Sequence, residues 1–206
     1  MSLRSVIVSQ FERPHGLLGR LAGLIMATRP SNRKRNQWTV ELLAIQPVHR
    51  ILEIGCGPGI ALKSCAAKVS EGGVVGIDHS EVMVSQASKR LAGEIKAGRA
   101  DVRLVGLFDG SLEDGTYDRV YSLNVFQFFL DMEEGFRRVH ECLVSGGKVA
   151  TTYQPRSKNP TRGNALEMAA SIEKTMKAVG FVGIERHELL FKPAPVICVI
   201  GRKTEA

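Results

Sequence analysis

The chain has 206 residues, a length typical of one domain and too short for two full-sized ones. Its composition, 44% hydrophobic and 24% charged, is ordinary for a folded globular protein and argues against extensive disorder. No apolar run approaches the ~18 residues that a membrane span requires, so we expect no transmembrane segment. The first residues also lack the features of a secretory signal.

The charge is distributed unevenly along the chain. The formal net charge is +7, and residues 1–50, with eight basic and two acidic residues, carry +6 of it. This excess indicates an anionic partner near the N-terminal segment: an acidic small molecule, a membrane surface or nucleic acid. The alternative is a solvated, arginine-rich helix face with no partner.

The four cysteines give information about cofactors and compartment. Cys56, Cys65, Cys142 and Cys198 show no paired spacing of the kind that metal ligands adopt. We therefore expect no metal site, and we expect reduced thiols in a cytoplasmic protein.

Residues 1–47 are predicted to form a helical lid. Leucines and an isoleucine between Leu17 and Ile25 mark one helical face, and residues 33–45 form a second helical piece that carries Trp38. We expect both to pack on the edge of a sheet. An amphipathic helix lying on a membrane surface is the alternative.

From residue 48 onward, short apolar runs alternate with helical stretches, which predicts one domain over residues 48–206. The alternation is typical of a doubly wound, Rossmann-like α/β fold with a mostly parallel sheet. The expected strands are 50–54, 74–78, 102–105, 119–123, 148–153, 182–190 and 196–201, and the expected helices are 59–68, 80–98, 131–142 and 164–179.

The last strand and the last helix have recognisable ends. Only residues 191–195, with two prolines, join the final two strands, so the seventh strand should run antiparallel. Asn164 is expected to cap the preceding helix, with Glu167 three residues later, and Gly180 to close it.

A glycine-rich turn follows the first strand. Glu53 is followed by Gly55, Gly57 and Gly59, and a helix begins near Pro58. Glycines allow a sharp turn, positive φ and close approach to a ligand, and the helix N-terminus attracts an anion. The dinucleotide fingerprint would require glycine at position 60, which is an isoleucine, so the spacing disfavours a nicotinamide oxidoreductase.

The second strand ends in a carboxylate. Asp78 lies 21 residues after Gly57, where a doubly wound nucleotide site places an acid for the two ribose hydroxyls. The two strand ends together predict a nucleoside-binding site.

These motifs resemble those of the class I S-adenosylmethionine-dependent methyltransferases, whose first motif is acid-x-Gly-x-Gly-x-Gly. The resemblance continues through His79-Ser80 and the helix after it, and through the segments 114–120, 123–126 and 143–148. It implies S-adenosyl-L-methionine as cofactor and S-adenosyl-L-homocysteine as product. The N-terminal lid is similar to that of the small-molecule branch, which includes quinone-biosynthesis C-methyltransferases.

The resemblance also implies which residues hold the cofactor. Glu53 would lie near the cofactor ammonium and the loop amides, Cys56 would lend its backbone without acting as a nucleophile, and His79 would pack beside the ribose or adenine. A Cβ at Gly57 is expected to collide with the ligand or with the turn. The implied cofactor-binding set is Glu53, Gly55, Cys56, Gly57, Gly59, Asp78, His79, Met83, Leu107, Asn124 and Val125.

One position departs from the family pattern. Related sequences place an acid after strand three to hold the adenine amino group, but residues 105–108 of this chain are apolar or glycine. Asp101 precedes the strand and Asp109 comes two residues late. We expect adenine to lie between Leu107 and Met83 instead.

Methyl transfer from a sulfonium is an in-line displacement that requires mainly alignment and exclusion of water, so we assign no catalytic residue. The acceptor should lie near Asn124 and Val125. Asn124 is followed by Val-Phe-Gln and not by the Pro-Pro-Tyr of nucleic-acid amino methylation, so we expect a small-molecule acceptor rather than nucleic acid. An anionic acceptor is favoured by two basic clusters that are expected to focus a positive potential over the mouth of the pocket. The first is Arg29, Arg33, Lys34 and Arg35, and the second is Arg156, Lys158 and Arg162, which follow strand five on the carboxyl-end side of the sheet. Candidate bases or substrate contacts are His15, Gln127, His140 and Tyr153.

A second class of function is a catalytically silent S-adenosylmethionine-binding module that regulates a partner or contacts RNA. The basic N-terminal segment is consistent with RNA contact, but the sequence shows no aromatic-interleaved RNA platform. The sequence does not define the oligomeric state.

Overall fold

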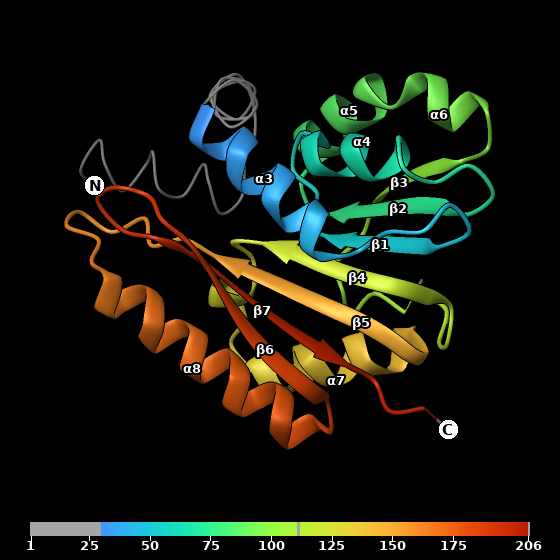
Figure 1. Cartoon of the computed structure of the whole chain (residues 1–206). Coiled ribbons are helices and arrows are strands. Elements are labelled where there is room, and N and C mark those ends of the chain that lie inside the picture. Colours follow the sequence, from blue (N-terminus) through green and yellow to red (C-terminus); the bar gives the residue numbers. More distant parts are fainter. Residues whose placement is uncertain (1–29, 111, 206) are drawn as a thin grey trace.

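The computed structural model describes residues 30–110 and 112–205 as helices packed on both faces of one sheet (Figure 1). The seven strands have the order β3-β2-β1-β4-β5-β7-β6. The elements are α3 (Pro30–Leu42), β1 (Arg50–Ile54), α4 (Ile60–Ala66), β2 (Gly73–Asp78), α5 (Glu81–Arg90), α6 (Ala92–Lys96), β3 (Ala100–Leu104), β4 (Tyr117–Leu123), η1 (Phe126–Phe128), α7 (Met132–Cys142), β5 (Leu143–Tyr153), α8 (Arg162–Val179), β6 (Val182–Leu189) and β7 (Val196–Arg202).

The strand directions confirm the expected doubly wound, mostly parallel sheet. Strands β1 to β5 pair in parallel, each reached by a crossover, whereas β7 runs antiparallel to both β5 and β6. The short link between β6 and β7 leaves no room for a parallel crossover, which explains why the last strand reverses.

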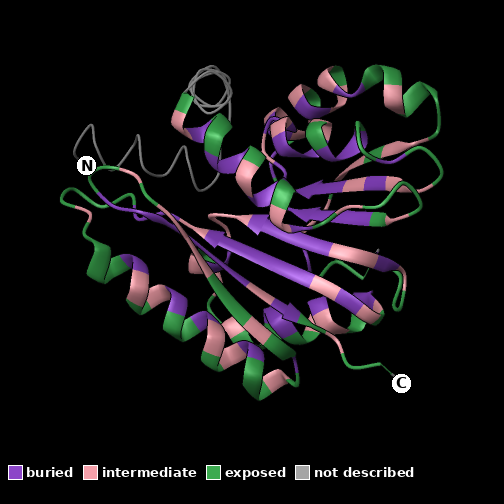
Figure 2. Ribbon diagram, viewed as in Figure 1, coloured by how far each residue is buried: buried purple, intermediate pink, exposed green. Residues whose placement is uncertain are grey.

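Each face of the sheet has its own hydrophobic core. In β1, Ile51 faces the core beneath α3, α4 and α5, and its neighbour Leu52 faces the core beneath α7 and α8. Alternate residues of a strand point to opposite faces, so a strand that is covered on both sides is apolar throughout. Figure 2 shows the result: the central strands are buried along their length, and the helices are exposed only on their outer sides.

Two helices differ from the sequence-based expectation. Thr161, and not Asn164, is the N-cap of α8; the Thr161 hydroxyl accepts from the Asn164 amide, and the Asn164 side chain accepts from the Thr161 amide. Gly180 closes that helix at φ 106° as expected. The predicted helix 80–98 is two helices, because the backbone at Leu91 departs from helical geometry (φ −100°, ψ 15°).

Helix α3 is tied to the sheet by side-chain hydrogen bonds. It begins at Pro30, a residue that favours the first helical position because it has no N–H to leave unpaired. The hydroxyl oxygens of Thr39 and Thr152 lie 2.8 Å apart, and Arg119 Nε donates to the Leu43 carbonyl just after the helix at 2.8 Å. These contacts fix α3 above β4 and β5.

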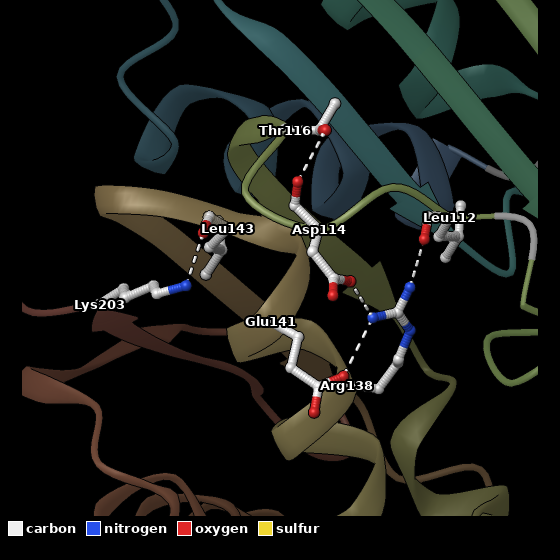
Figure 3. Close-up of polar contacts among 7 residues, drawn as sticks. All are labelled: Leu112, Asp114, Thr116, Arg138, Glu141, Leu143 and Lys203. Carbon is white, nitrogen blue, oxygen red and sulfur yellow. Dashed lines mark hydrogen bonds and ion pairs between the residues drawn. The ribbon is translucent and has the colours of Figure 1, made fainter.

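The connection between β3 and β4 is fastened to α7 by one arginine (Figure 3). Arg138 Nη1 donates to Asp114 Oδ1 at 2.5 Å and to Glu141 Oε2 at 3.0 Å, and Nη2 donates to the Leu112 carbonyl. The anchored connection begins with residues 105–108, which form one wall of the cavity described below.

Some expectations fall outside the described residues. His15 and the predicted helix at 17–25 belong to the segment 1–29, which the structure does not describe. Among the described residues, no helix combines the length and the apolar character that a membrane crossing demands.

Candidate functional site

A large cavity opens at the carboxyl ends of the parallel strands. Its volume is about 1280 Å³, and its walls include the last residues of β1, β2, β4 and β5. Ligands of open α/β sheets bind at these strand ends, where the order of the strands reverses direction. The reversal here lies between β1 and β4, at the centre of the cavity.

The glycine-rich turn after β1 needs its glycines for two different reasons. Gly55, Gly57 and Gly59 all have positive φ, at 65°, 52° and 75°. A Cβ at Gly55 would lie 2.6 Å from Val125 Cγ2, and one at Gly59 would lie 2.9 Å from Ala87 Cβ. These two glycines are therefore required by packing as well as by backbone conformation.

Gly57 differs from its neighbours. A Cβ built there meets no atom within 4 Å, although the residue lines the cavity. The expected collision with the turn itself is therefore wrong, because the Cβ would point into open space. Collision with a bound ligand stays a prediction.

Asp78 ties the end of β2 to this turn. Its Oδ2 accepts from the Gly57 amide at 2.9 Å, and its Oδ1 accepts from the Ser80 amide at 2.9 Å. Burial raises the pKa of the Asp78 carboxyl, and the two amides oppose that shift. The carboxylate lines the cavity, so its remaining lone pairs can accept hydrogen bonds from ligand hydroxyls.

Glu53 lies beneath the turn in a buried polar group with Tyr121 and Cys65. The Tyr121 hydroxyl donates to Glu53 Oε2 at 2.8 Å, and the Cys65 thiol lies 3.3 Å from the same hydroxyl. Burial raises the pKa of Glu53 to about 8, and the hydrogen bond from Tyr121 is the largest influence that lowers it. Glu53 is thus an acid that a nearby cation would ionise.

The far side of the cavity, toward β3, is apolar. Met83 and Leu107 are buried and line the wall, and Phe108 lies beside them with half its surface exposed. Asp109 turns back to accept from the Gly106 amide at 2.6 Å and is not among the lining residues. The segment 105–110, which directly follows β3, therefore presents no acid to the cavity; the acids that line it beyond this segment are Asp131 and Glu134.

Hydrogen bonds between the ends of β4 and β5 shape the centre of the cavity. Asn124 has a left-handed backbone (φ 57°), a conformation that Asn tolerates better than most residues. Its side-chain amide donates to the Gln154 carbonyl at 2.7 Å and accepts from the Gln154 amide at 3.0 Å. Gln127 Nε2 donates to the Asn124 carbonyl at 2.8 Å. The side-chain amide of Asn124 and the Nε2 of Gln127 thus already have partners within the protein.

The wall next to β5 carries positive charge. Asn32 and Arg35 of α3 line it together with Arg156, which follows β5. Arg156 Nη2 donates to Asn32 Oδ1 at 2.8 Å, and Arg35 Nη2 donates to Asn36 Oδ1 at 3.3 Å. The cavity therefore has an apolar end over β3 and a cationic end over β5.

The structure brings most of the sequence-predicted site residues together. Those that line the cavity are Gly55, Gly57, Asp78, His79, Met83, Leu107, Asn124, Val125, Gln127 and Tyr153. Glu53, Cys56 and Gly59 lie behind this surface and support the turn. Burial raises the pKa of the Cys56 thiol well above its usual range, consistent with a backbone role. His140 lies elsewhere on α7, with its ring edge-on to Phe181 at 5.0 Å.

Sequence analysis missed Tyr121 and identified the cationic wall only as two separate basic clusters. Tyr121 was not identified because its pairing with Glu53 depends on β1 and β4 being neighbours, which the sequence alone does not specify. Arg35 and Arg156 were noted as members of basic clusters, but 121 positions separate them in the chain. Their shared wall follows from the packing of α3 on β5.

The residues present fit the expected cofactor. Gly57 leaves a hollow that a side chain would fill, Asp78 offers a carboxylate for ribose hydroxyls, and buried Glu53 lies where a cation would be stabilised. Met83 and Leu107 provide apolar surfaces for a purine. Among the described residues, no group of three or more His, Cys, Asp or Glu side chains is placed to hold a metal ion.

Comparisons with known proteins agree with this geometry. A family described as a methyltransferase domain matches residues 52–149. The methyltransferase YdaC of Bacillus subtilis is 31% identical over 188 residues, which cover 89% of this chain and 98% of that protein. The trans-aconitate 2-methyltransferase of Variovorax paradoxus is 29% identical over 140 residues, and the match spans 66% of this chain but 52% of that enzyme.

A solved structure shows the same fold. The phosphoethanolamine N-methyltransferase 2 of Haemonchus contortus, in complex with phosphomonomethylethanolamine and S-adenosylhomocysteine, aligns with a TM-score of 0.64. The two chains are 16% identical, and the alignment covers 88% of this chain and 59% of the nematode enzyme. At that identity the likeness concerns the fold and not the acceptor.

Proposed function

Because the chain belongs to the class I S-adenosylmethionine-dependent methyltransferases, we propose that it transfers a methyl group to a small-molecule acceptor by in-line displacement. One observation carries the proposal beyond the family: the cavity continues past the cofactor region, across β4, to a separate wall formed by α3 and the end of β5. Its volume of about 1280 Å³ exceeds the ~300–1,000 Å³ of an ordinary small-molecule site. An acceptor therefore has room beside the cofactor.

The cofactor, when bound, supplies a methyl group that its sulfonium has already activated. In our proposal the ribose hydroxyls donate to Asp78, the amino-acid end approaches Gly55 and Gly57, and the ammonium lies toward Glu53. Met83 and Leu107 hold the adenine. The same residues are the cofactor contacts that the sequence predicts.

The protein's part in the reaction is to position the acceptor and to exclude water. Asn124 clasps the backbone of Gln154 and so fixes the ends of β4 and β5, between which the acceptor would lie. Tyr153 and Gln127 line the same space. A rigid frame of this kind favours displacement because it holds the reacting atoms in line.

The acceptor itself is not defined by the relatives. The name of the Variovorax enzyme gives trans-aconitate as its substrate, whereas the name of YdaC gives no substrate. We propose a small molecule because the space for the acceptor lies within the same cavity as the space for the cofactor. We also propose a cytoplasmic location, because all four cysteines are free and buried thiols.

A methyl-labelling experiment tests the proposal. The protein is incubated with methyl-labelled S-adenosylmethionine and, separately, with the small-molecule, RNA and protein fractions of a bacterial extract. We expect label in the small-molecule fraction only, and we expect Asp78→Ala to abolish it. Label in RNA, or in no fraction, would favour the catalytically silent or RNA-contacting alternative.

A further inference from the structure

Two arginines from distant parts of the chain form one wall of the cavity. Arg35 lies in the middle of α3, and Arg156 lies in the segment after β5. We propose that Arg35 and Arg156 form an anion-binding subsite, and that the methyl acceptor is an acid whose carboxylate or phosphate they hold. The inference rests on the proposed function, since it names the chemical class of that acceptor.

Arg156 lies away from the cofactor region, whereas Arg35 is close enough to Glu53 for the two charges to interact. The order β3-β2-β1-β4-β5 places Leu107 and Asp78 over one half of the sheet and Arg156 over the other. Glu53, at the end of β1, marks the boundary between the halves. An anion held at Arg156 therefore lies beyond β4, on the side where the acceptor must approach.

Arg35 is a buried cation without an ion pair among the described residues. Only 8% of its surface is exposed, and burial together with the neighbouring Arg156 guanidinium lowers its pKa to about 9, although the charge of Glu53, which forms no salt bridge with it, opposes the shift. Its printed hydrogen bonds go to the neutral side chain of Asn36. Buried charges are ordinarily paired, so an arginine in a cavity wall and beside a second arginine is completed by a bound anion.

Asn32 and Gln154 complete the same wall. Asn32 holds Arg156 in place through the 2.8 Å hydrogen bond to its guanidinium. The side-chain oxygen of Gln154 is buried and has no hydrogen-bond partner among the described residues. The subsite therefore also offers an acceptor oxygen to a ligand that carries a hydroxyl or amine near its acid group.

The rest of the cavity suits an acid with an apolar body. Phe128 and Leu130, in the segment after β4, line it and keep about half or more of their surface exposed. Suitable probes therefore combine one anionic group with an aromatic ring. Benzoate and phenyl phosphate meet this description, and benzamide is the uncharged counterpart of benzoate.

Calorimetry with these probes tests the subsite. The protein is first saturated with S-adenosylhomocysteine and then titrated with benzoate, phenyl phosphate or benzamide. We expect one of the anions to bind with 1:1 stoichiometry at least tenfold more tightly than benzamide. Comparison of benzoate with phenyl phosphate identifies whether carboxylate or phosphate is preferred.

Matched variants assign the effect to the two arginines. Arg35→Gln and Arg156→Gln should each weaken anion binding about tenfold or more, since each removes a charge-assisted hydrogen bond. Arg35→Lys keeps the charge in case the glutamine variant does not fold, and should lose less affinity. Arg162→Gln is the control: it removes the same charge nearby, where the structure pairs it with Glu188, and should change nothing.

Three results would overturn the proposal. One is equal affinity for benzoate, phenyl phosphate and benzamide. Another is anion binding that survives both glutamine substitutions unchanged. The third is a tenfold loss of S-adenosylhomocysteine affinity in Arg35→Gln with unaltered anion binding, which would assign the arginine to the cofactor's own carboxylate. Failure of the wild type to bind S-adenosylhomocysteine would instead refute the proposed function.

Discussion

At the scale of single residues, the most informative contact is the one between Glu53 and Tyr121. The Tyr121 hydroxyl lies 2.8 Å from a carboxylate whose pKa burial raises to about 8. Such a carboxyl is largely neutral near pH 7 in the protein alone. A bound cationic ligand would lower its pKa and favour the ionised form. Glu53 therefore couples cofactor binding to pH.

The raised pKa of Glu53 determines how stability and cofactor binding each change with pH. The folded-state pKa of Glu53 is above its ordinary value of 4.5, so its contribution to stability is fully present below pH 4.5 and lost as pH rises through 8. Cofactor binding has the opposite trend, because the ammonium prefers the ionised carboxylate. We predict that S-adenosylmethionine affinity rises between pH 6 and pH 8, by up to about tenfold per unit.

Tyr121→Phe should move that pH profile upward. The hydroxyl stabilises the carboxylate, so its removal raises the pKa of Glu53 and shifts the rise in affinity to higher pH. Tyr117→Phe, at the opposite end of β4 and equally buried, is the control and should leave the profile in place. Isothermal calorimetry at several pH values measures both. A flat profile, or the same profile in wild type and Tyr121→Phe, would contradict this role.

At the scale of elements, the glycines of the turn between β1 and α4 differ in whether packing requires them. Gly55 and Gly59 have neighbours that a Cβ would strike, whereas the Cβ position of Gly57 is open toward the cavity. The three glycines look alike in the sequence. Only the structure shows that the Cβ position of one of them is open, which leaves room for a ligand.

Valine substitutions should distinguish these roles. Gly57→Val should fold, at a cost of about 1–2 kcal/mol for positive φ, and lose S-adenosylhomocysteine binding more than 100-fold. Gly98→Val is the matched control, since Gly98 also has positive φ (70°) and an open Cβ position. It should suffer similar destabilisation and bind normally. Thermal unfolding and calorimetry measure the two effects.

The outcome at Gly59 completes the test. A Cβ there would lie 3.0 Å from the Ala87 backbone, so Gly59→Val should be destabilised more than Gly57→Val. Normal cofactor affinity in Gly57→Val would show that the ligand does not approach this turn.

The elements also show which strands and helix ends the sequence pattern predicts. Apolar runs predicted the central strands, because strands buried on both faces are apolar throughout. The outer strands β3 and β6 contain charged residues and are half-buried or exposed. The break between α5 and α6 at Leu91 was missed, since no Pro marks it and the hydrophobic pattern continues. The N-cap of α8 was placed at Asn164, three residues late, because Thr161 and Asn164 form a reciprocal capping box in which either residue has a suitable side chain.

At the scale of the whole molecule, the strand order gives the cavity an apolar half over β3 and a cationic half over β5, which we propose to hold the cofactor and the acceptor. The glycine turn, Asp78 and the family motifs were predictable because they lie close together in sequence around two strand ends. The cationic wall was predictable only as two basic clusters near the mouth of the pocket, because the approach of Arg35 to Arg156 requires α3 to pack across β5. The division of the chain into a lid at residues 1–47 and a domain at 48–206 stays a prediction.

The account's central claim is that this cavity binds S-adenosylmethionine and not a dinucleotide. Titration calorimetry of the full chain with S-adenosylmethionine, S-adenosylhomocysteine and NAD tests it most directly. We predict 1:1 binding of the first two ligands at least 100-fold more tightly than NAD, because the third glycine is at position 59 and Asp78 faces the cavity. NAD binding more tightly than both would contradict the account.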